Sequence, residues 1–263
     1  MNSKQSLLVL FLTVAVAVGW LVLRDTSEDS ESTSPAATSP EADSTSGAND
    51  SSAARVDRVP TPAEDLPDFS SISDTKAKKQ AFFDYFRPIV AAENERMLAE
   101  REIISATSNP RELQPWCDKY RADPCSQEEL LTHVDAIPMS MALAQAAVES
   151  AWGTSRFAVN AYNFFGQWCF TEGCGLVPSK RSAGAHHEVQ VFDHPKDAVR
   201  AYFRNINSHP AYEPARDIRL EARERGQSVS GSAMVGGLLS YSGIGEHYID
   251  ELRSVIRVNK LTD

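Results

Sequence analysis

The stretch that decides the fold is residues 144–153, which read AQAAVESAWG. Pro138 and Ser140 lie just ahead of it and are residues that commonly begin a helix. The alanine-dense run that follows predicts a helix to about Ala151, stopped by Gly153, a natural residue for a helix C-terminus.

Glu149 is the residue of this helix with the clearest chemical potential. Ala146 and Gln145 lie one turn before it, so its carboxylate sits among small and apolar side chains and loses hydration, which raises its pKa. It also lies in the last helical turn, where the negative end of the helix dipole disfavours an anion. Both effects favour a protonated carboxyl near neutral pH, as a general acid requires. The alternative is an ordinary surface glutamate or an ion-pair partner of Arg156.

Working outward, apolar residues recur at helical spacing over much of the chain. A loop is expected around Pro110 and Pro115, and the chain over 160–177 is expected to be rich in loops. Polar and apolar residues alternate over 187–192, which predicts one strand of a small hairpin. Ser126 or Asp123 is expected to cap the helix predicted over 127–133. The predicted helices are 76–105 (bent at Pro88), 127–133, 197–207, 229–239 and 247–258. The expected fold class is mostly α (α+β).

Composition narrows the partners. The 263 residues include 26 basic and 36 acidic side chains, a net charge of −10, which argues against nucleic acid as a partner. Ten acidic residues and only two basic ones fall between Asp25 and Asp65, so most of the acidity belongs to a tail.

The N-terminus has the pattern of a membrane segment. Lys4 precedes seventeen uncharged residues, Leu7 to Leu23, and Arg24 closes the run. This is at the short end of what spans a bilayer, yet long for a cleaved signal, and no small-x-small cleavage site follows it. Residues 1–24 are therefore predicted to be a single-pass signal anchor, with the rest outside the cytoplasm. A cleaved signal and a secreted protein are the alternative.

The four cysteines suit an exported protein. Local disulfides, Cys117–Cys125 and Cys169–Cys174, are preferred because each closes a short loop. Reduced buried thiols and a zinc site are the alternatives. His186, His187 and Glu188 lack a spaced third ligand, so no metal and no cofactor is predicted.

The run AQAAVESAWG, followed by NFFG at 163–166, resembles the endo-β-N-acetylglucosaminidase family of peptidoglycan hydrolases, glycoside hydrolase family 73. That family contains flagellar rod muramidases and bacterial autolysins. Within it, the cysteine-bearing segment 167–178 is similar to the Bax-type proteins. The resemblance covers roughly residues 137–261 and implies a lysozyme-like α domain with a small β hairpin.

It further implies cleavage of the β-1,4 bond after N-acetylglucosamine, with Glu149 as the acid on the glycosidic oxygen. The expected division is a signal anchor (1–24), a disordered acidic linker (25–66), a helical region packed on the core (67–136) and a catalytic domain (137–263). The expected partners are peptidoglycan glycan strands and, through the anchor, a bacterial inner membrane, which places the catalytic domain in the periplasm. No particular protein partner is indicated.

The second catalytic group is left open. Glycosidases usually pair an acid with a nucleophile or base. The family's hairpin glutamate has no counterpart within 176–185, and Glu188 and Glu172 are the nearest candidates. Glu188 alternates with Val189, so it is expected to face a cleft or solvent. The substrate's own acetamido group is a third possibility.

Aromatic residues complete the predicted site. The resemblance places Tyr241 near the acid, where it orients groups or stabilises charge, and Tyr248 matches a second family tyrosine, in a site or packing role. Trp168 and Tyr162 are predicted to line a glycan groove, with Asn163 and Phe165 of the NFFG run. Phe164 and Trp152 are expected in the core. The rival functions are an amidase that removes the peptide from the sugar and a non-catalytic peptidoglycan-binding module.

Overall fold

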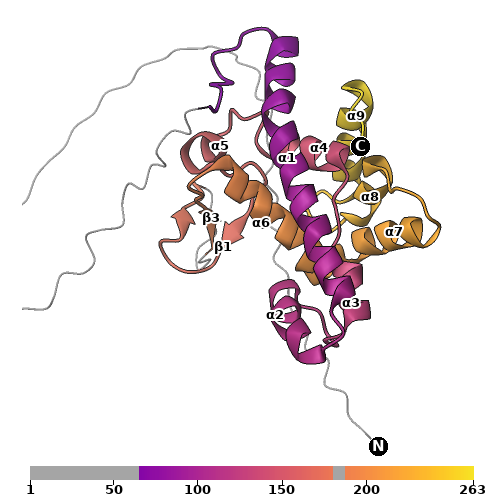
Figure 1. Ribbon diagram of the computed structural model, residues 1–263. Coiled ribbons are helices and arrows are strands. Elements are labelled where there is room, and N and C mark those ends of the chain that lie inside the picture. Colours follow the sequence, from indigo (N-terminus) through magenta and orange to yellow (C-terminus); the bar gives the residue numbers. More distant parts are fainter. Residues whose placement is uncertain (1–64, 180–186) are drawn as a thin grey trace, which may run out of the picture. The chain divides into compact units, whose positions relative to one another are not determined.

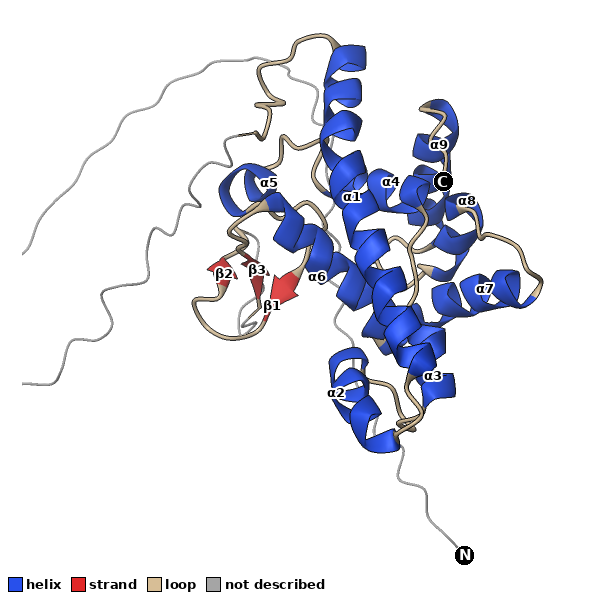
Figure 2. Cartoon of the chain, viewed as in Figure 1, coloured by secondary structure: helices blue, strands red, loops and turns tan. Residues whose placement is uncertain are grey.

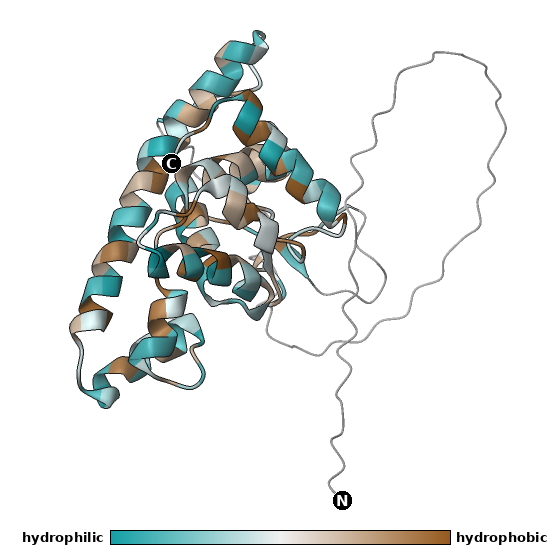
Figure 3. Ribbon diagram, turned by 90° about the vertical axis from the view of Figure 1, so that its right-hand side faces the viewer, coloured by the Kyte–Doolittle hydropathy of each residue, from teal (hydrophilic) through white to brown (hydrophobic). Residues whose placement is uncertain are grey.

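The computed structural model describes residues 65–179 and 187–263. Its longest helix, α1 (Thr75–Ala106), runs through the middle of the view in Figure 1, with the strands on one side of it and α7, α8 and α9 on the other. Asp74 caps it by accepting a 2.7 Å hydrogen bond from the Ala77 backbone N–H. Its apolar stripe, which includes Phe82, Phe86 and Met97, is buried, while polar residues alternate with it around the helix (Figure 3). The prediction of this helix is confirmed, and the helix continues through Pro88.

The other helices are shorter. They are α2 (Pro110–Tyr120), α3 (Gln127–His133), α4 (Met139–Glu149), α5 (Arg156–Ala161), α6 (Pro195–Ser208), α7 (Glu213–Glu224), α8 (Gly231–Met234) and α9 (Glu246–Val258). Of these, α3, α4 and α6 pack on α1, and α8 and α9 pack on α4 (Figure 2). Two 3-10 turns lie at Pro210–Tyr212 and Val235–Gly237. The mostly α fold class is confirmed.

The observed helices differ from the predictions in three places. The expected loop at Pro110 is α2, because a proline is tolerated at the first helical position and Asn109 caps the helix through the Arg111 N–H. The expected helix over 229–239 tightens into a 3-10 turn at its two glycines. The short helix α5 was not predicted; it lies ahead of the loop-rich stretch predicted over 160–177 and shares only residues 160 and 161 with it.

The helix α7 was not predicted at all. Two of its inward residues are arginines, Arg216 and Arg219, so its buried face lacks the apolar pattern that identifies a helix.

The β structure is a three-stranded antiparallel sheet rather than a hairpin. The strand β3 (Glu188–Gln190) lies between β1 (Trp168–Cys169) and β2 (Gly175–Leu176). Cys169 pairs with Glu188, and Val189 pairs with both Trp168 and Leu176. Both preferred disulfides, Cys117–Cys125 and Cys169–Cys174, are present.

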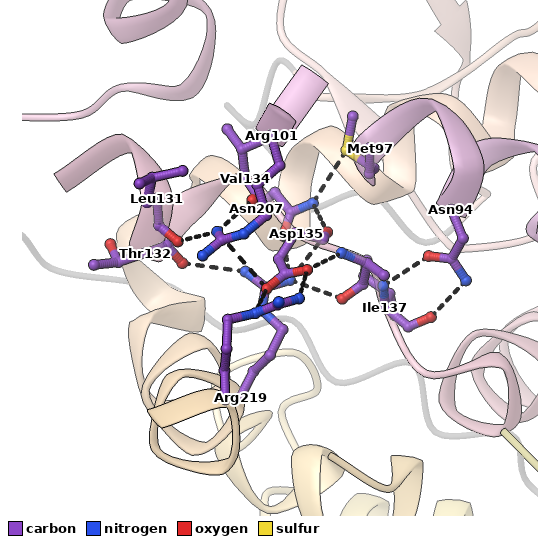
Figure 4. Close-up of polar contacts among 12 residues, drawn as sticks. Asn94, Met97, Arg101, Leu131, Thr132, Val134, Asp135, Ile137, Asn207 and Arg219 are labelled. Atoms are coloured by element: carbon purple, nitrogen blue, oxygen red, sulfur yellow. Dashed lines mark hydrogen bonds and ion pairs between the residues drawn. The ribbon is translucent and has the colours of Figure 1, made fainter. Parts of the chain in front are cut away.

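Polar contacts fix the segment that leads into α4. Asn94 of α1 donates to the Ile137 carbonyl (2.9 Å) and accepts from the Ile137 N–H (2.8 Å). Arg219 donates to the carbonyls of Thr132 and His133 and, over 2.7 Å, to Oδ1 of Asn207. Figure 4 shows how these side chains surround the segment. The start of α4 is thereby tied to α1, α6 and α7.

No helix within 65–179 or 187–263 is long and apolar enough to cross a membrane. The predicted anchor (1–24) and residues 25–64 of the predicted linker lie outside the described part of the chain.

Candidate active site

Glu149 is the last residue of α4, and the chain turns sharply after it. Ala151, Trp152 and Gly153 all have positive φ angles. The Ser150 hydroxyl accepts from the Gly153 N–H (2.9 Å) and donates to the Ala146 carbonyl (2.6 Å), which ends the helix two residues earlier than predicted. Gly153 is required because a β-carbon there would lie 2.3 Å from the Phe69 ring.

The surroundings of Glu149 favour its protonated form. Burial raises the pKa of Glu149 to about 7, the Tyr248 hydroxyl acts in the opposite direction as a hydrogen-bond donor, and the charge of Glu251 raises the pKa further. Arg156 donates instead to the Val177 carbonyl, and no ion pair with Glu149 forms among the described residues. Glu149 as a whole residue is half-buried. An acid of this pKa holds its proton near neutral pH and can release it to a substrate.

The NFFG loop lies against Glu149. Gly166 (φ +66°) faces the carboxyl so closely that a β-carbon there would lie 3.1 Å from Glu149 Oε2. Asn163 shapes the loop: its amide donates to the carbonyls of Gln167 (2.8 Å) and Gln190 (2.9 Å), and its Oδ1 accepts from the Gln167 N–H (3.0 Å).

A chain of buried hydrogen bonds leads to the same carboxyl. The Tyr202 hydroxyl donates to Gln145 Oε1 (2.6 Å), and Gln145 Nε2 donates to the Tyr248 hydroxyl oxygen (3.0 Å). Because the amide nitrogen can only donate, the Tyr248 proton is left to point toward Glu149. Gln145 lies one turn before Glu149 on α4, while Tyr202 comes from α6 and Tyr248 from α9.

Tyr241 packs on Tyr248, next to Glu149. Its hydroxyl donates to the Phe165 carbonyl (2.8 Å), and its ring stacks almost parallel on Tyr248 with centroids 5.6 Å apart. Burial and the nearby charge of Glu149 raise the pKa of Tyr241, so it stays a neutral donor. The structure thus brings two predicted site residues, Tyr241 and Tyr248, together with Glu149.

The predicted groove residues separate into two groups. Tyr162, Asn163 and Phe165 are buried, and Phe165 stacks on Tyr202 at 4.2 Å, so these side chains support the loop from inside. Trp168 is 38% exposed, with its ring 3.8 Å from that of His187. The expectation that Phe164 and Trp152 pack inward agrees with their ring contacts to Phe82.

Glu188 faces neither of the two surroundings expected for it. Its side chain is buried, and its two carboxylate oxygens accept from the backbone N–H groups of Gly173 (3.0 Å) and Gly175 (2.7 Å). Glu172 is exposed on the same loop. The sulfurs of Cys169 and Cys174 lie near the Glu188 carboxylate in a grouping that resembles a metal site, but they are joined in a disulfide and are not available as thiolate ligands.

Sequence reasoning did not identify Gln145, Tyr202 or Gly166 as parts of the site. Gln145 could have been found, because a residue four positions before Glu149 shares its helix face. Tyr202 carried no local signal, since it meets Gln145 only through the packing of α6 on the rest of the domain.

Comparisons with known proteins identify the family of the chain. Residues 127–261 match the glucosaminidase family, described as mannosyl-glycoprotein endo-beta-N-acetylglucosaminidase. The chain is similar to protein bax of Escherichia coli (strain K12), with 31% identity over 211 residues, 74% of each protein. A more distant likeness is to the catalytic domain of the autolysin Auto from Listeria monocytogenes, with 15% identity, a TM-score of 0.38, and coverage of 73% of this chain and 89% of that one. The chain therefore belongs to the glucosaminidase family and is a glycoside hydrolase.

Proposed function

We propose that the protein hydrolyses the β-1,4 bond on the reducing side of N-acetylglucosamine in peptidoglycan, with Glu149 as the general acid. The observation that carries the proposal is the carboxyl at the end of α4, whose pKa burial raises to about 7 and which has hydrogen-bond support but no cationic partner among the described residues. The family supplies the bond type. Peptidoglycan follows from the motif resemblance and from the predicted export, since it is the N-acetylglucosamine polymer that a bacterial protein meets outside the inner membrane.

In the first step, Glu149 gives its proton to the glycosidic oxygen while the bond from that oxygen to the sugar C1 breaks. The new carboxylate is stabilised by the donated hydrogen bond of Tyr248, whose direction Gln145 and Tyr202 determine. The same donor lowers the pKa of Glu149, so the proton leaves more readily in the transition state than burial alone would allow.

For the second group we favour the substrate's own acetamido oxygen over Glu188. That oxygen attacks C1 from the opposite face and forms a cyclic intermediate, which water opens while returning a proton to Glu149. Glu188 is buried, and its two oxygens accept from the backbone N–H groups of Gly173 and Gly175, so its carboxyl is turned toward the disulfide loop. Two displacements at C1 predict that the product keeps the β configuration.

The test is digestion of purified peptidoglycan with wild type and Glu149→Gln, followed by mass spectrometry of the new reducing ends. We expect ends at N-acetylglucosamine from wild type and none from the variant. Glu224→Gln, an exposed glutamate of α7, is the matched control and should behave as wild type. Release of free peptides in a chelator-sensitive reaction would favour the amidase. Binding without any product would favour a non-catalytic module.

The proposed setting is the periplasm, with residues 1–24 holding the domain to the inner membrane. Cell fractionation of a tagged full-length chain checks this, since an anchored protein stays in the membrane pellet after a high-salt wash and a cleaved one does not.

A further inference from the structure

The disulfide loop between β1 and β2 is held by two independent constraints. The Cys169–Cys174 bond closes it, and the Glu188 carboxylate, buried beneath it, accepts from the N–H groups of Gly173 and Gly175. Hydrogen bonds to an ionised acceptor are about twice as strong as neutral ones. Cys169 and Glu188 are also partners across the sheet, so the strand register places the carboxylate under the loop.

This constrained loop presents large apolar side chains to solvent. Phe170, within the disulfide ring, is 77% exposed. Trp168, two residues earlier, is 38% exposed and in contact with the His187 ring, and Val177 beyond β2 is 49% exposed. Neighbouring exposed aromatic residues on a rigid support are typical of a binding surface rather than of a packing element.

Few residues of chain separate the loop from Gly166, which lies against the acid. Gly166 lies against the Glu149 carboxyl, and Trp168 follows it by two residues and Phe170 by four. An extended chain covers at most about 3.6 Å per residue, so the two backbones lie within about 7 Å and about 14 Å of Gly166. These aromatic residues are therefore within the reach of a short oligosaccharide that is bound at Glu149.

We propose that Phe170, together with Trp168, forms a sugar-stacking subsite for the glycan strand, and that Glu188 is a positioning residue which acts through the loop. The inference rests on the proposed function. A sugar ring presents an apolar C–H face that an aromatic ring covers, and a loop fixed in advance pays less entropy when the sugar binds. Glu188, which the sequence singled out as a second catalytic carboxylate, thus supports substrate binding without touching the reacting atoms.

The first experiment compares Phe170→Ala with wild type on two substrates, soluble uncrosslinked glycan strands and an aryl N-acetylglucosaminide that is too short to reach the loop. We expect KM for glycan strands to rise about three- to tenfold, as for the loss of one aromatic contact, with kcat unchanged. Activity on the aryl glycoside should not change. Phe170→Tyr should restore the wild-type KM, and Ile103→Ala, an exposed apolar residue of α1, is the matched control. An unchanged KM for Phe170→Ala on glycan strands overturns the proposal.

The second experiment tests the role of Glu188. In Glu188→Gln the side-chain NH2 group replaces one of the two acceptor oxygens. One of the two loop N–H groups therefore loses its hydrogen bond, while the volume of the side chain stays the same. We expect KM for glycan strands to rise as in Phe170→Ala, and the double variant to be no worse than Phe170→Ala alone, because both changes remove the same contact. Loss of kcat on the aryl glycoside in Glu188→Gln would make Glu188 catalytic and overturn its positioning role.

A failure of the proposed function can be distinguished from a failure of the proposed subsite. If wild type cleaves no glycan, co-sedimentation of the Glu149→Gln protein with insoluble peptidoglycan still tests the subsite. Weaker sedimentation of Glu149→Gln/Phe170→Ala supports it, and equal sedimentation overturns it. If wild type cleaves glycan and Phe170→Ala matches it on both substrates, only the subsite is wrong.

Discussion

Gly166 and Glu149 lie so close together that a β-carbon on Gly166 would be 3.1 Å from Glu149 Oε2. The two residues belong to the two motifs that the sequence singles out, the AQAAVESAWG run and the NFFG run. Their contact explains in physical terms why a glycine is needed in the second motif: it supplies a positive φ and it leaves room for the acid.

Gly166→Ala should abolish most activity while it costs no more stability than an alanine at a glycine of similar φ elsewhere in the chain. The added methyl group meets the carboxyl and moves it from its hydrogen-bonding position, which we expect to lower kcat by about a hundredfold. Gly226→Ala is the matched control, because Gly226 has nearly the same φ (+67°) but no atom within 4 Å of an added β-carbon. Both variants should lose about 1–2 kcal/mol of unfolding free energy from backbone strain. Equal activity of the two variants would contradict the contact's role.

Glu149→Gln should stabilise the protein above neutral pH. Because burial raises the pKa of Glu149 from 4.5 to about 7, the folded state keeps a proton that the unfolded state has lost, and wild-type stability falls as pH rises from about 4.5 to 7. Glutamine avoids this loss. We expect the variant to gain up to about 3 kcal/mol at pH 8 and nothing below pH 4. Chemical denaturation of both proteins at both pH values measures the difference in unfolding free energy between the variant and wild type. A difference that does not change with pH would refute the raised pKa of Glu149.

Tyr248→Phe should move the alkaline limb of the pH–activity profile to higher pH. The Tyr248 hydroxyl lowers the pKa of Glu149, so its removal raises that pKa, and a general acid is active only below its pKa. We also expect kcat to fall about tenfold or more, because the new carboxylate loses a hydrogen bond. Tyr212→Phe is the control, since the Tyr212 hydroxyl bonds with Asn205 instead. A profile that shifts equally in both variants would remove the special role of Tyr248.

Arg219→Met should destabilise the domain without acting on the chemistry directly. Arg219 is only 4% exposed, and burial lowers its pKa to about 10, with Asp135 opposing this. Its loss removes the Arg219 donor from the carbonyls of Thr132, His133 and Ala136, which should cost about 3–5 kcal/mol. Arg225→Met, which removes an exposed ion pair with Glu221, should cost less than about 0.5 kcal/mol. Urea unfolding of both variants checks the contrast.

Much of the fold could be read from local patterns. The helices α1, α3 and α6 carry apolar residues at spacings that are set within the helix, and each disulfide closes a short loop, so neighbouring residues determine them. The same holds for the position of Glu149 at the end of α4, where local sequence already predicts a raised pKa.

The hydrogen bonds that support that acid were decided by tertiary structure. Tyr202 and Gln145 are 57 residues apart, and nothing in a helical period indicates that their side chains meet. Glu188 shows the same limit: alternation along a strand states that it lies opposite Val189, but only the folded loop buries it. Hydropathy does not predict the burial of Arg219, because that burial depends on hydrogen bonds to carbonyls of a segment distant in the sequence. Periodicity shows which face a side chain occupies, whereas the element that packs against that face depends on long-range contacts.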